Sequence, residues 1–173
     1  MEHSFIEDNH SEVYLKAKAC KEASKTFQLT SSSDKNKILL TLSNLILEYQ
    51  EDILENNLLD INHAKTLGFT TSQLDRLSLD EKRIHALSKS VLDIIQLEDP
   101  IGQIMETFIR PNGLEIHKKR VPLGVIAIIY ESRPNVTIDA SILAIKTGNC
   151  VILRGGKEAI NTNIYLTSLI KNA

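Results

Sequence analysis

The chain has 173 residues, of which 42% are hydrophobic and 24% are charged. A chain of this size can bury roughly 70% of its unfolded surface in one core, so wholesale disorder is excluded. Twenty Lys and Arg residues against 22 Asp and Glu residues give a net charge of −2, which provides no overall field for attracting nucleic acid or an anionic membrane. We therefore expect no nucleic-acid and no membrane partner, and any phosphate chemistry must use a local site.

The cysteines and the apolar segments indicate a cytoplasmic protein. Cys20 and Cys150 are too few for a disulfide framework, which favours a reducing compartment. The longest apolar stretch, around 121–130, is roughly ten residues long, whereas a membrane-spanning helix needs about twenty. The acidic start, MEHSFIEDNHSE, lacks the basic and apolar regions of a signal peptide.

Residues 1–100 predict a helical layer of four or five helices. Two amphipathic helices show apolar side chains at helical spacing: Ile38, Leu42, Leu45 and Tyr49 in the first, and Ile84, Leu87, Val91 and Ile94 in the second. Helix starts are indicated by three possible capping boxes: Ser31 with Asp34, Thr70 with Gln73, and Ser78 with Glu81.

Residues 101–121 predict a β-hairpin arm. The segment 103–120 has an extended pattern, and Arg110-Pro111-Asn112-Gly113 supplies the turn. The basic run 117–120 favours a charged edge strand, which blocks unwanted strand pairing, over a nucleic-acid contact.

Residues 122–173 predict the order β-α-β-α, the first half of a doubly wound parallel sheet in an α/β fold. The apolar runs 125–130 and 150–153 are typical of strands that are buried on both faces. One helix is expected from about 135 to 147, ending at Gly148, and another from about 158 onward. Because two such strands leave sheet edges uncovered, we expect the chain to be the N-terminal piece of a longer protein.

Two loops in this region carry the residues that could bind a ligand. The segments 130–135 and 154–157 each follow a predicted strand, and ligands of open α/β sheets gather outside the carboxyl ends of the strands. Gly155 and Gly156 let a ligand approach the backbone, and the cationic residues on either side of them suit a phosphate or a ribose. Neither a P-loop nor a G-x-G-x-x-G fingerprint occurs in the sequence.

Simpler interpretations stay open for the same residues. Asn135 could cap the helix that follows it, and Gly155-Gly156 could form only a tight turn. Cys150 lies in an apolar strand pattern and is interpreted as a buried, unreactive side chain, and Cys20 as part of a helix face. The five histidines show no metal-ligand spacing and the carboxylates form no identifiable acid/base pair, so no metal site is expected.

The segment 121–159, VPLGVIAIIYESRPNVTIDASILAIKTGNCVILRGGKEA, closely resembles the core signature of the γ-glutamyl phosphate reductases, also called glutamate-5-semialdehyde dehydrogenases. The resemblance extends back through LDRLSLDEKRI, EDPIGQI and RPNGLEIHKKR and covers the chain from about residue 10 onward. YESRPNVT and LRGGKEA are its most specific blocks. The chain is thereby identified as the N-terminal portion of a member of the aldehyde dehydrogenase superfamily.

This resemblance implies an enzyme that reduces L-glutamyl 5-phosphate with NADPH to L-glutamate 5-semialdehyde and phosphate, a step of proline biosynthesis. In the superfamily a cysteine thiolate attacks the acyl carbon, phosphate leaves, and the nicotinamide supplies a hydride. That cysteine and its catalytic domain are expected beyond residue 173, so Cys150 is not the nucleophile and the chain alone is expected to be inactive. Asn135 is expected to stabilise the oxyanion, with Arg133 as an alternative there or as a contact of the acyl phosphate.

The resemblance also implies a cofactor site for NADP. Ser132 is expected near the nicotinamide end of the cofactor. Arg154 is expected at the adenosine ribose and, with Lys157, at the 2′-phosphate that distinguishes NADP from NAD. Gly155 and Gly156 belong to the same cofactor loop.

Partners follow from the same resemblance. Glutamate 5-kinase is expected as the pathway neighbour, and the arm 101–121 resembles the superfamily's oligomerisation arm, so a homo-oligomer is expected. Two alternatives stay open: a truncated, non-catalytic paralogue that acts as an assembly or regulatory module, and the reductase half of a bifunctional synthetase fused to a glutamate kinase.

Overall fold

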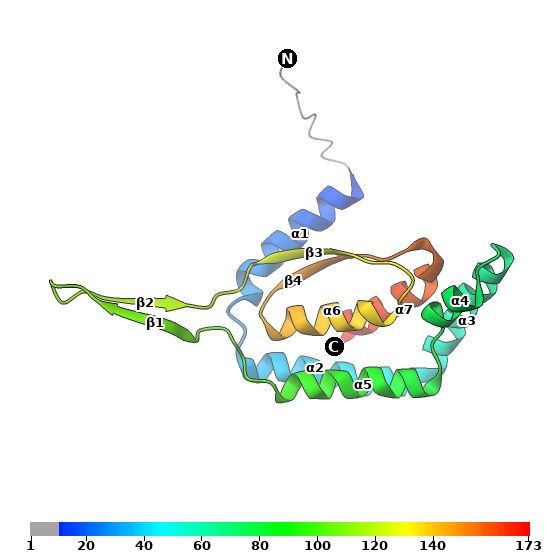
Figure 1. Cartoon of the computed structure of the whole chain (residues 1–173), viewed down its shortest axis with the longest axis horizontal. Coiled ribbons are helices and arrows are strands. Elements are labelled where there is room, and N and C mark those ends of the chain that lie inside the picture. Colours follow the sequence, from blue (N-terminus) through cyan, green and yellow to red (C-terminus); the bar gives the residue numbers. More distant parts are fainter. Residues whose placement is uncertain (1–10) are drawn as a thin grey trace, which may run out of the picture.

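The computed structural model describes residues 11–173 (Figure 1). Five helices come first: α1 (Glu12–Phe27), α2 (Ser32–Glu48), α3 (Gln50–Thr66), α4 (Thr71–Leu77) and α5 (Glu81–Gln96). The second half contains β1 (Ile104–Ile109), β2 (Glu115–Lys119), β3 (Val125–Ile129), α6 (Asn135–Lys146), β4 (Cys150–Arg154), the 3-10 turn η1 (Lys157–Ala159) and α7 (Ile160–Asn172). The predicted order of helices, hairpin and β-α-β-α unit is confirmed.

Within residues 11–173, no helix is both long and apolar enough to cross a bilayer. The acidic start, which lacks the features of a signal peptide, falls almost wholly in residues 1–10, outside the described residues.

The helical core lies on one side of the β3–β4 pair. In Figure 1, α6 and α7 run under the two strands and α2 and α5 run under α6 and α7. The side chains that meet there are almost completely buried: Leu39, Leu42, Ile46, Ile84, Leu87, Val91, Ile138, Ile142, Leu166 and Leu169. Burial of these side chains is the main stabilising force of the molecule, because each contributes about 1.5 to 3 kcal/mol when it leaves water.

The buried face of α2 differs from the prediction. Leu39, Leu42 and Ile46 are fully buried, whereas Tyr49, which was assigned to the buried face, is 37% exposed. The apolar residues of α2 extend around more than half of the helix, so their spacing is compatible with burial of either of two neighbouring faces. Packing against α5 determines which of the two faces is buried. In α5 the predicted face is confirmed.

Of the three predicted capping boxes, Thr70 with Gln73 is complete. Ser31 caps α2, because its hydroxyl accepts from the Asp34 amide at 3.1 Å, but the Asp34 carboxylate accepts from the Ser31 hydroxyl and not from the Ser31 amide. The third is wrong: Asp80 is the N-cap of α5 and accepts from the Arg83 amide at 2.7 Å. Ser78 instead ends α4, and its carbonyl accepts from the Arg83 guanidinium at 2.7 Å.

Strands β3 and β4 are parallel, with Val125 opposite Cys150 and Ile129 opposite Arg154. Helix α1 lies over one face of the pair and α6 over the other (Figure 1). The prediction of burial on both faces is wrong within the described residues, because Ala127 and Ile129 are exposed. Each strand pairs only with the other in this part of the chain, and α1 covers only part of the outer face.

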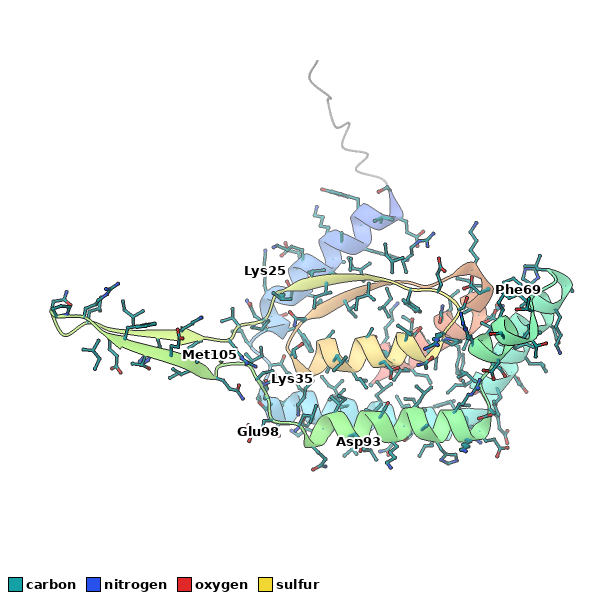
Figure 2. All side chains as sticks on the ribbon, viewed as in Figure 1. Lys25, Lys35, Phe69, Asp93, Glu98 and Met105 are labelled. Atoms are coloured by element: carbon teal, nitrogen blue, oxygen red, sulfur yellow. The ribbon has the colours of Figure 1, made fainter. Side chains whose placement is uncertain are left out.

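The hairpin arm projects away from the helical core (Figure 1). Strands β1 and β2 are antiparallel, and every residue in both is exposed. The predicted turn is confirmed: Gly113 has a φ of +84° and its amide donates to the Arg110 carbonyl at 2.8 Å. Among the described residues, β1 and β2 make their main contacts with each other, and the side chains of the arm surround the ribbon away from the helices (Figure 2).

The base of the arm is fixed by Asp99. Its carboxylate accepts from the Ser32 hydroxyl at 2.5 Å and from the Ile101 amide at 2.9 Å, and it forms an ion pair with Lys35. Lys35 is buried and Asp99 is partly buried, with side chains 3% and 13% exposed. This ion pair therefore joins the arm to helix α2.

The helix boundaries in the second half follow the prediction closely. Helix α6 ends at Lys146, and Gly148 takes the left-handed conformation (φ +66°) of a Schellman cap, with its amide and that of Asn149 donating back into the last turn. Helix α7 begins at Ile160, slightly later than predicted, because residues 157–159 form the 3-10 turn η1 first.

Candidate functional site

The two predicted ligand-binding loops lie side by side at the carboxyl ends of β3 and β4. The Tyr130 amide donates to the Arg154 carbonyl at 3.1 Å, which continues the strand pairing into the loops. The backbone amide and the hydroxyl of Ser132 both donate to the Glu158 carboxylate, at 2.6 and 3.0 Å. The expectation that Ser132 and Gly155 share one edge of the sheet is therefore met.

Glu158 fixes the conformation of the first loop. Ser132 is the one non-glycine residue of 11–173 with a positive φ (+50°), a conformation that costs free energy unless its surroundings stabilise it. Burial by itself would raise the pKa of Glu158, but hydrogen bonds from its own amide and from Ser132 outweigh burial and lower the pKa. The carboxylate is thus ionised at neutral pH and holds the strained loop in place.

A side chain at either glycine of the second loop would displace a neighbouring side chain. A Cβ at Gly155 would overlap the Asn163 amide and lie 3.2 Å from the Tyr130 ring, and a Cβ at Gly156 would overlap the Glu158 carboxylate. The tight-turn interpretation is wrong, because residues 155 and 156 form no turn and neither has a positive φ. The side chains of Asn163 and Glu158 occupy the space beside the two glycines, so this packing explains the glycines without any ligand.

A chain of hydrogen bonds between largely buried side chains fixes the positions of both loops. The Tyr130 hydroxyl and the Thr137 hydroxyl are 2.5 Å apart, and the Thr137 hydroxyl donates to the Asn163 side chain at 2.9 Å. Burial raises the pKa of Tyr130, although the bond with Thr137 acts in the opposite direction. The chain connects β3, α6 and α7, so it keeps the loops in one relative position.

Two cationic side chains stand at the same edge. Arg154 and Lys157 are exposed, and among residues 11–173 neither forms a salt bridge. Because no carboxylate neutralises them, both are available to an anionic ligand.

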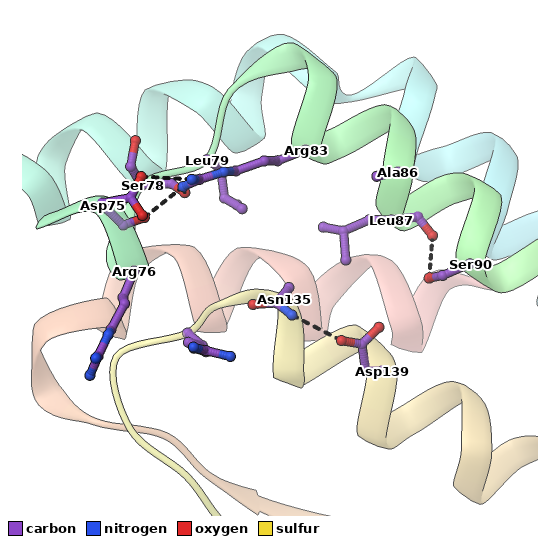
Figure 3. Close-up of a pocket in the computed structure, with 11 residues that line it drawn as sticks. Asp75, Arg76, Ser78, Leu79, Arg83, Ala86, Leu87, Ser90, Asn135 and Asp139 are labelled. Carbon is purple, nitrogen blue, oxygen red and sulfur yellow. Dashed lines mark hydrogen bonds and ion pairs between the residues drawn. The ribbon is translucent and has the colours of Figure 1, made fainter. Parts of the chain in front are cut away.

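Arg133 and Asn135 face a different space. Both line a pocket of about 400 Å³ between helices α4 and α5 and the first turns of α6 (Figure 3). The Asn135 amide nitrogen donates to the Asp139 carboxylate at 2.9 Å, and Pro134 occupies the N-cap of α6. The capping interpretation of Asn135 is therefore wrong, because its side chain points along α6 and does not reach the free amides of the helix start.

Neither cysteine resembles an activated nucleophile. Burial, and then the neighbouring Cys20, raise the pKa of the Cys150 thiol, which disfavours the reactive thiolate. Both cysteines are free and partly buried. Within residues 11–173, no group of three or more His, Cys, Asp or Glu side chains could hold a metal ion.

A family model described as "Aldehyde dehydrogenase family" matches residues 4–173. The chain belongs to this family. The gamma-glutamyl phosphate reductase of Clostridium perfringens (strain SM101) is 49% identical over 164 residues, which are 95% of this chain and 40% of that protein. The corresponding protein of Caldanaerobacter subterraneus is 48% identical over 162 residues, or 94% of this chain and 39% of that one. The chain thus spans about 40% of the length of these curated relatives.

Solved structures support the same membership of the aldehyde dehydrogenase family. The gamma-glutamyl phosphate reductase of Thermotoga maritima has a TM-score of 0.91 at 40% identity and aligns with 94% of this chain and 39% of its own. The Saccharomyces cerevisiae structure of the same name has a TM-score of 0.89 at 30% identity and aligns with 94% of this chain and 41% of its own. The resemblance recognised in the sequence is confirmed.

For this aldehyde dehydrogenase family member, the predicted site residues fall into two groups. Ser132, Arg154, Gly155, Gly156 and Lys157 lie at the carboxyl ends of β3 and β4, whereas Arg133 and Asn135 line the pocket. The two groups meet in the loop after β3, where Ser132 of the first group is followed directly by Arg133 of the second.

Sequence reasoning missed two residues of this site. Glu158 was missed because only the folded loops bring it to Ser132. Asp139 was missed although a signal existed: it stands four residues after Asn135, one turn along the same helix, where side chains meet.

Proposed function

We propose that this chain is the N-terminal part of the NADP-binding domain of a γ-glutamyl phosphate reductase, which reduces L-glutamyl 5-phosphate to L-glutamate 5-semialdehyde and phosphate. The observation that carries the proposal is the identity of 49% over 164 residues with the Clostridium perfringens reductase, in a segment whose two loops share one sheet edge. Within this proposal, residues 1–100 form a helical layer, 101–121 an oligomerisation arm, and 122–173 the start of the parallel sheet.

The cofactor is held by the loop between β4 and η1. Arg154 contacts the adenosine ribose and, with Lys157, the 2′-phosphate. The fit rests on their exposure and on the absence of any salt bridge to them within residues 11–173. Ser132 approaches the nicotinamide end. When bound, NADPH supplies the hydride for the reduction.

The acyl group is oriented by the other loop. One hydrogen of the Asn135 amide is used by Asp139, and the second is free to donate to an oxyanion at the acyl carbon. Arg133 contacts the acyl phosphate, for which a guanidinium is well suited. The attacking thiolate comes from outside residues 1–173.

The proposal includes partners and a compartment. Glutamate 5-kinase would supply the acyl phosphate as pathway neighbour. The arm would pair with a second copy of the protein, since its side chains are all exposed. Two free cysteines are consistent with a reducing, cytoplasmic location.

A chimera tests this function. The chain replaces the matching segment of the Clostridium perfringens reductase, and NADPH formation is followed with L-glutamate 5-semialdehyde, phosphate and NADP. We expect turnover by the chimera and none by the 173-residue chain alone. A chimera that folds and assembles without turnover would favour the non-catalytic assembly module instead.

A substitution at Arg154 tests its assigned role in cofactor binding. Arg154→Ala should raise the KM for NADP by about tenfold, the typical effect of one lost charged contact, and leave the KM for the semialdehyde nearly unchanged. Lys89→Ala, which removes an exposed cation on α5, serves as the matched control. Equal effects of Arg154→Ala on both KM values would refute the role.

A further inference from the structure

Asp139 is a carboxylate that the fold itself does not need. It lines the pocket between α4, α5 and α6, and its partner among residues 11–173 is the neutral amide of Asn135, not a cation (Figure 3). Burial raises its pKa, and the hydrogen bond from Asn135 only partly offsets this rise. Ionised Asp139 therefore costs folding free energy at neutral pH, because the folded state favours its protonated form.

The pocket around Asp139 has the size and the charges of a site for a small zwitterion. Its volume of about 400 Å³ lies within the range of small-molecule sites. Arg76 of α4 lines it and forms no salt bridge within residues 11–173, whereas Arg83 is held by the Asp75 carboxylate at 2.7 Å. Arg133 also lines the pocket and likewise forms no salt bridge within residues 11–173. Within the described residues the pocket thus offers one carboxylate without a cationic partner, Asp139, and two guanidiniums without an anionic partner, of which Arg76 is the one on α4.

A glutamyl chain can reach Asn135 and Asp139 together. The Asn135 Nδ2 and the Asp139 carboxylate oxygen that it contacts are 2.9 Å apart. The acyl carbon and the α-nitrogen of an extended glutamyl chain are about 5 Å apart, from standard bond lengths. Because each ligand group lies about 3 Å from its own partner, an acyl oxygen at Asn135 leaves the α-nitrogen within reach of Asp139.

We propose that this pocket binds the amino-acid end of the substrate, with Asp139 accepting hydrogen bonds from the α-ammonium group and Arg76 attracting the α-carboxylate. The inference rests on the proposed function and names the part of the site that selects an amino-acid substrate.

The experiment compares two aldehydes in the chimera with Clostridium perfringens sequence. L-Glutamate 5-semialdehyde carries the α-ammonium group, and 5-oxopentanoate lacks it. In each reaction the aldehyde and phosphate give the acyl phosphate while a hydride passes to NADP and a proton is released. Asp139→Asn should lower kcat/KM for the amino-acid substrate by about 10- to 100-fold, the range for one hydrogen bond to a charged group. The value for 5-oxopentanoate should change by less than about threefold.

Two controls separate binding from folding. Asp93→Asn makes the same chemical change on the exposed face of α5 and should alter neither substrate. Asp139→Ser serves as a second variant, and thermal unfolding of both Asp139 variants should occur at or above the midpoint of the parent.

The outcomes are distinguishable. Equal losses on both aldehydes in an active chimera would overturn the role of Asp139 and leave the proposed function intact. A parent chimera inactive on both aldehydes would overturn the proposed function and this inference together.

Discussion

The helical core and the hairpin arm are stabilised in opposite ways. In the core, the apolar faces of α2, α5, α6 and α7 bury one another, and the largest side chains lose all contact with water. In the arm, Phe108 is 52% exposed and Ile109 74% exposed, so apolar surface is left uncovered on a two-stranded ribbon. A lone hairpin is marginally stable in water. The core therefore folds through its own contacts, whereas the apolar side chains of the arm find no cover among residues 11–173.

Truncation in the centre of the core should give the largest loss of stability. Leu42→Ala removes a fully buried side chain where α2 packs on α5, and should lower the free energy of unfolding by about 4 kcal/mol. Denaturant unfolding followed by circular dichroism measures this change. Leu40→Ala on the exposed side of the same helix should cost less than about 1 kcal/mol. Similar losses for both variants would contradict the assigned core.

The junction of core and arm should come second. Asp99→Asn leaves the buried Lys35 without its counter-ion and should cost about 3 kcal/mol in the free energy of unfolding. Amide hydrogen exchange should show the first loss of protection in residues 99–104, at the base of the arm. Unchanged protection there would mean that the ion pair does not anchor the arm.

The same carboxylate predicts a pH dependence. Burial would raise the pKa of Asp99, but hydrogen bonds from Lys35, Ser32 and the Ile101 amide outweigh it and lower the pKa. Its stabilising effect is complete above the unfolded-state value of about 3.9 and is lost as pH falls through the lowered folded-state pKa. Between pH 6 and pH 2, the free energy of unfolding should therefore change less with pH for Asp99→Asn than for the parent chain, as denaturant unfolding at each pH would measure.

A polar contact inside the core should have a smaller effect. Buried Asp60 of α3 accepts from the Asn161 and Thr162 amides, at 3.1 and 2.8 Å, and thereby caps the start of α7. Asp60→Asn removes the charge and points an NH₂ group at these donors, so it should cost about 2 kcal/mol. Chemical denaturation tests this against Glu55→Gln, which changes an exposed carboxylate on the same helix.

The arm itself should give the smallest effect on folding. Phe108→Ser removes an exposed side chain and should change the free energy of unfolding of the single chain by less than about 0.5 kcal/mol. In the chimera the same substitution should weaken self-association, which light scattering over a concentration series would detect. A large folding defect together with unchanged association would reverse the comparison between core and arm.

Local patterns in the sequence predicted most of the elements, and the errors have a common physical cause. The turn at Gly113 and the helix end at Gly148 were predictable because each depends on the backbone freedom of one residue. The buried face of α2 and the N-cap of α5 were not predictable in the same way. At each of them the local sequence allows alternatives of similar free energy, and packing against neighbouring helices determines which one forms. Burial of β3 was overestimated because an apolar strand pattern does not report which neighbours cover it.

The sequence by itself determined the order of helices and strands, the parallel pairing of two apolar segments, and the family, because periodicity, turn residues and the blocks YESRPNVT and LRGGKEA are local properties. Only the tertiary structure decided that Glu158 locks Ser132 in a left-handed conformation and that Asp139 lies uncompensated beside Asn135. The contact between Glu158 and Ser132 joins residues 26 positions apart, so the sequence does not show that they meet. Asp139 and Asn135 are close in the sequence, but only the folded structure shows that α4 and α5 enclose them in a pocket, and this burial sets the free energy of the carboxylate.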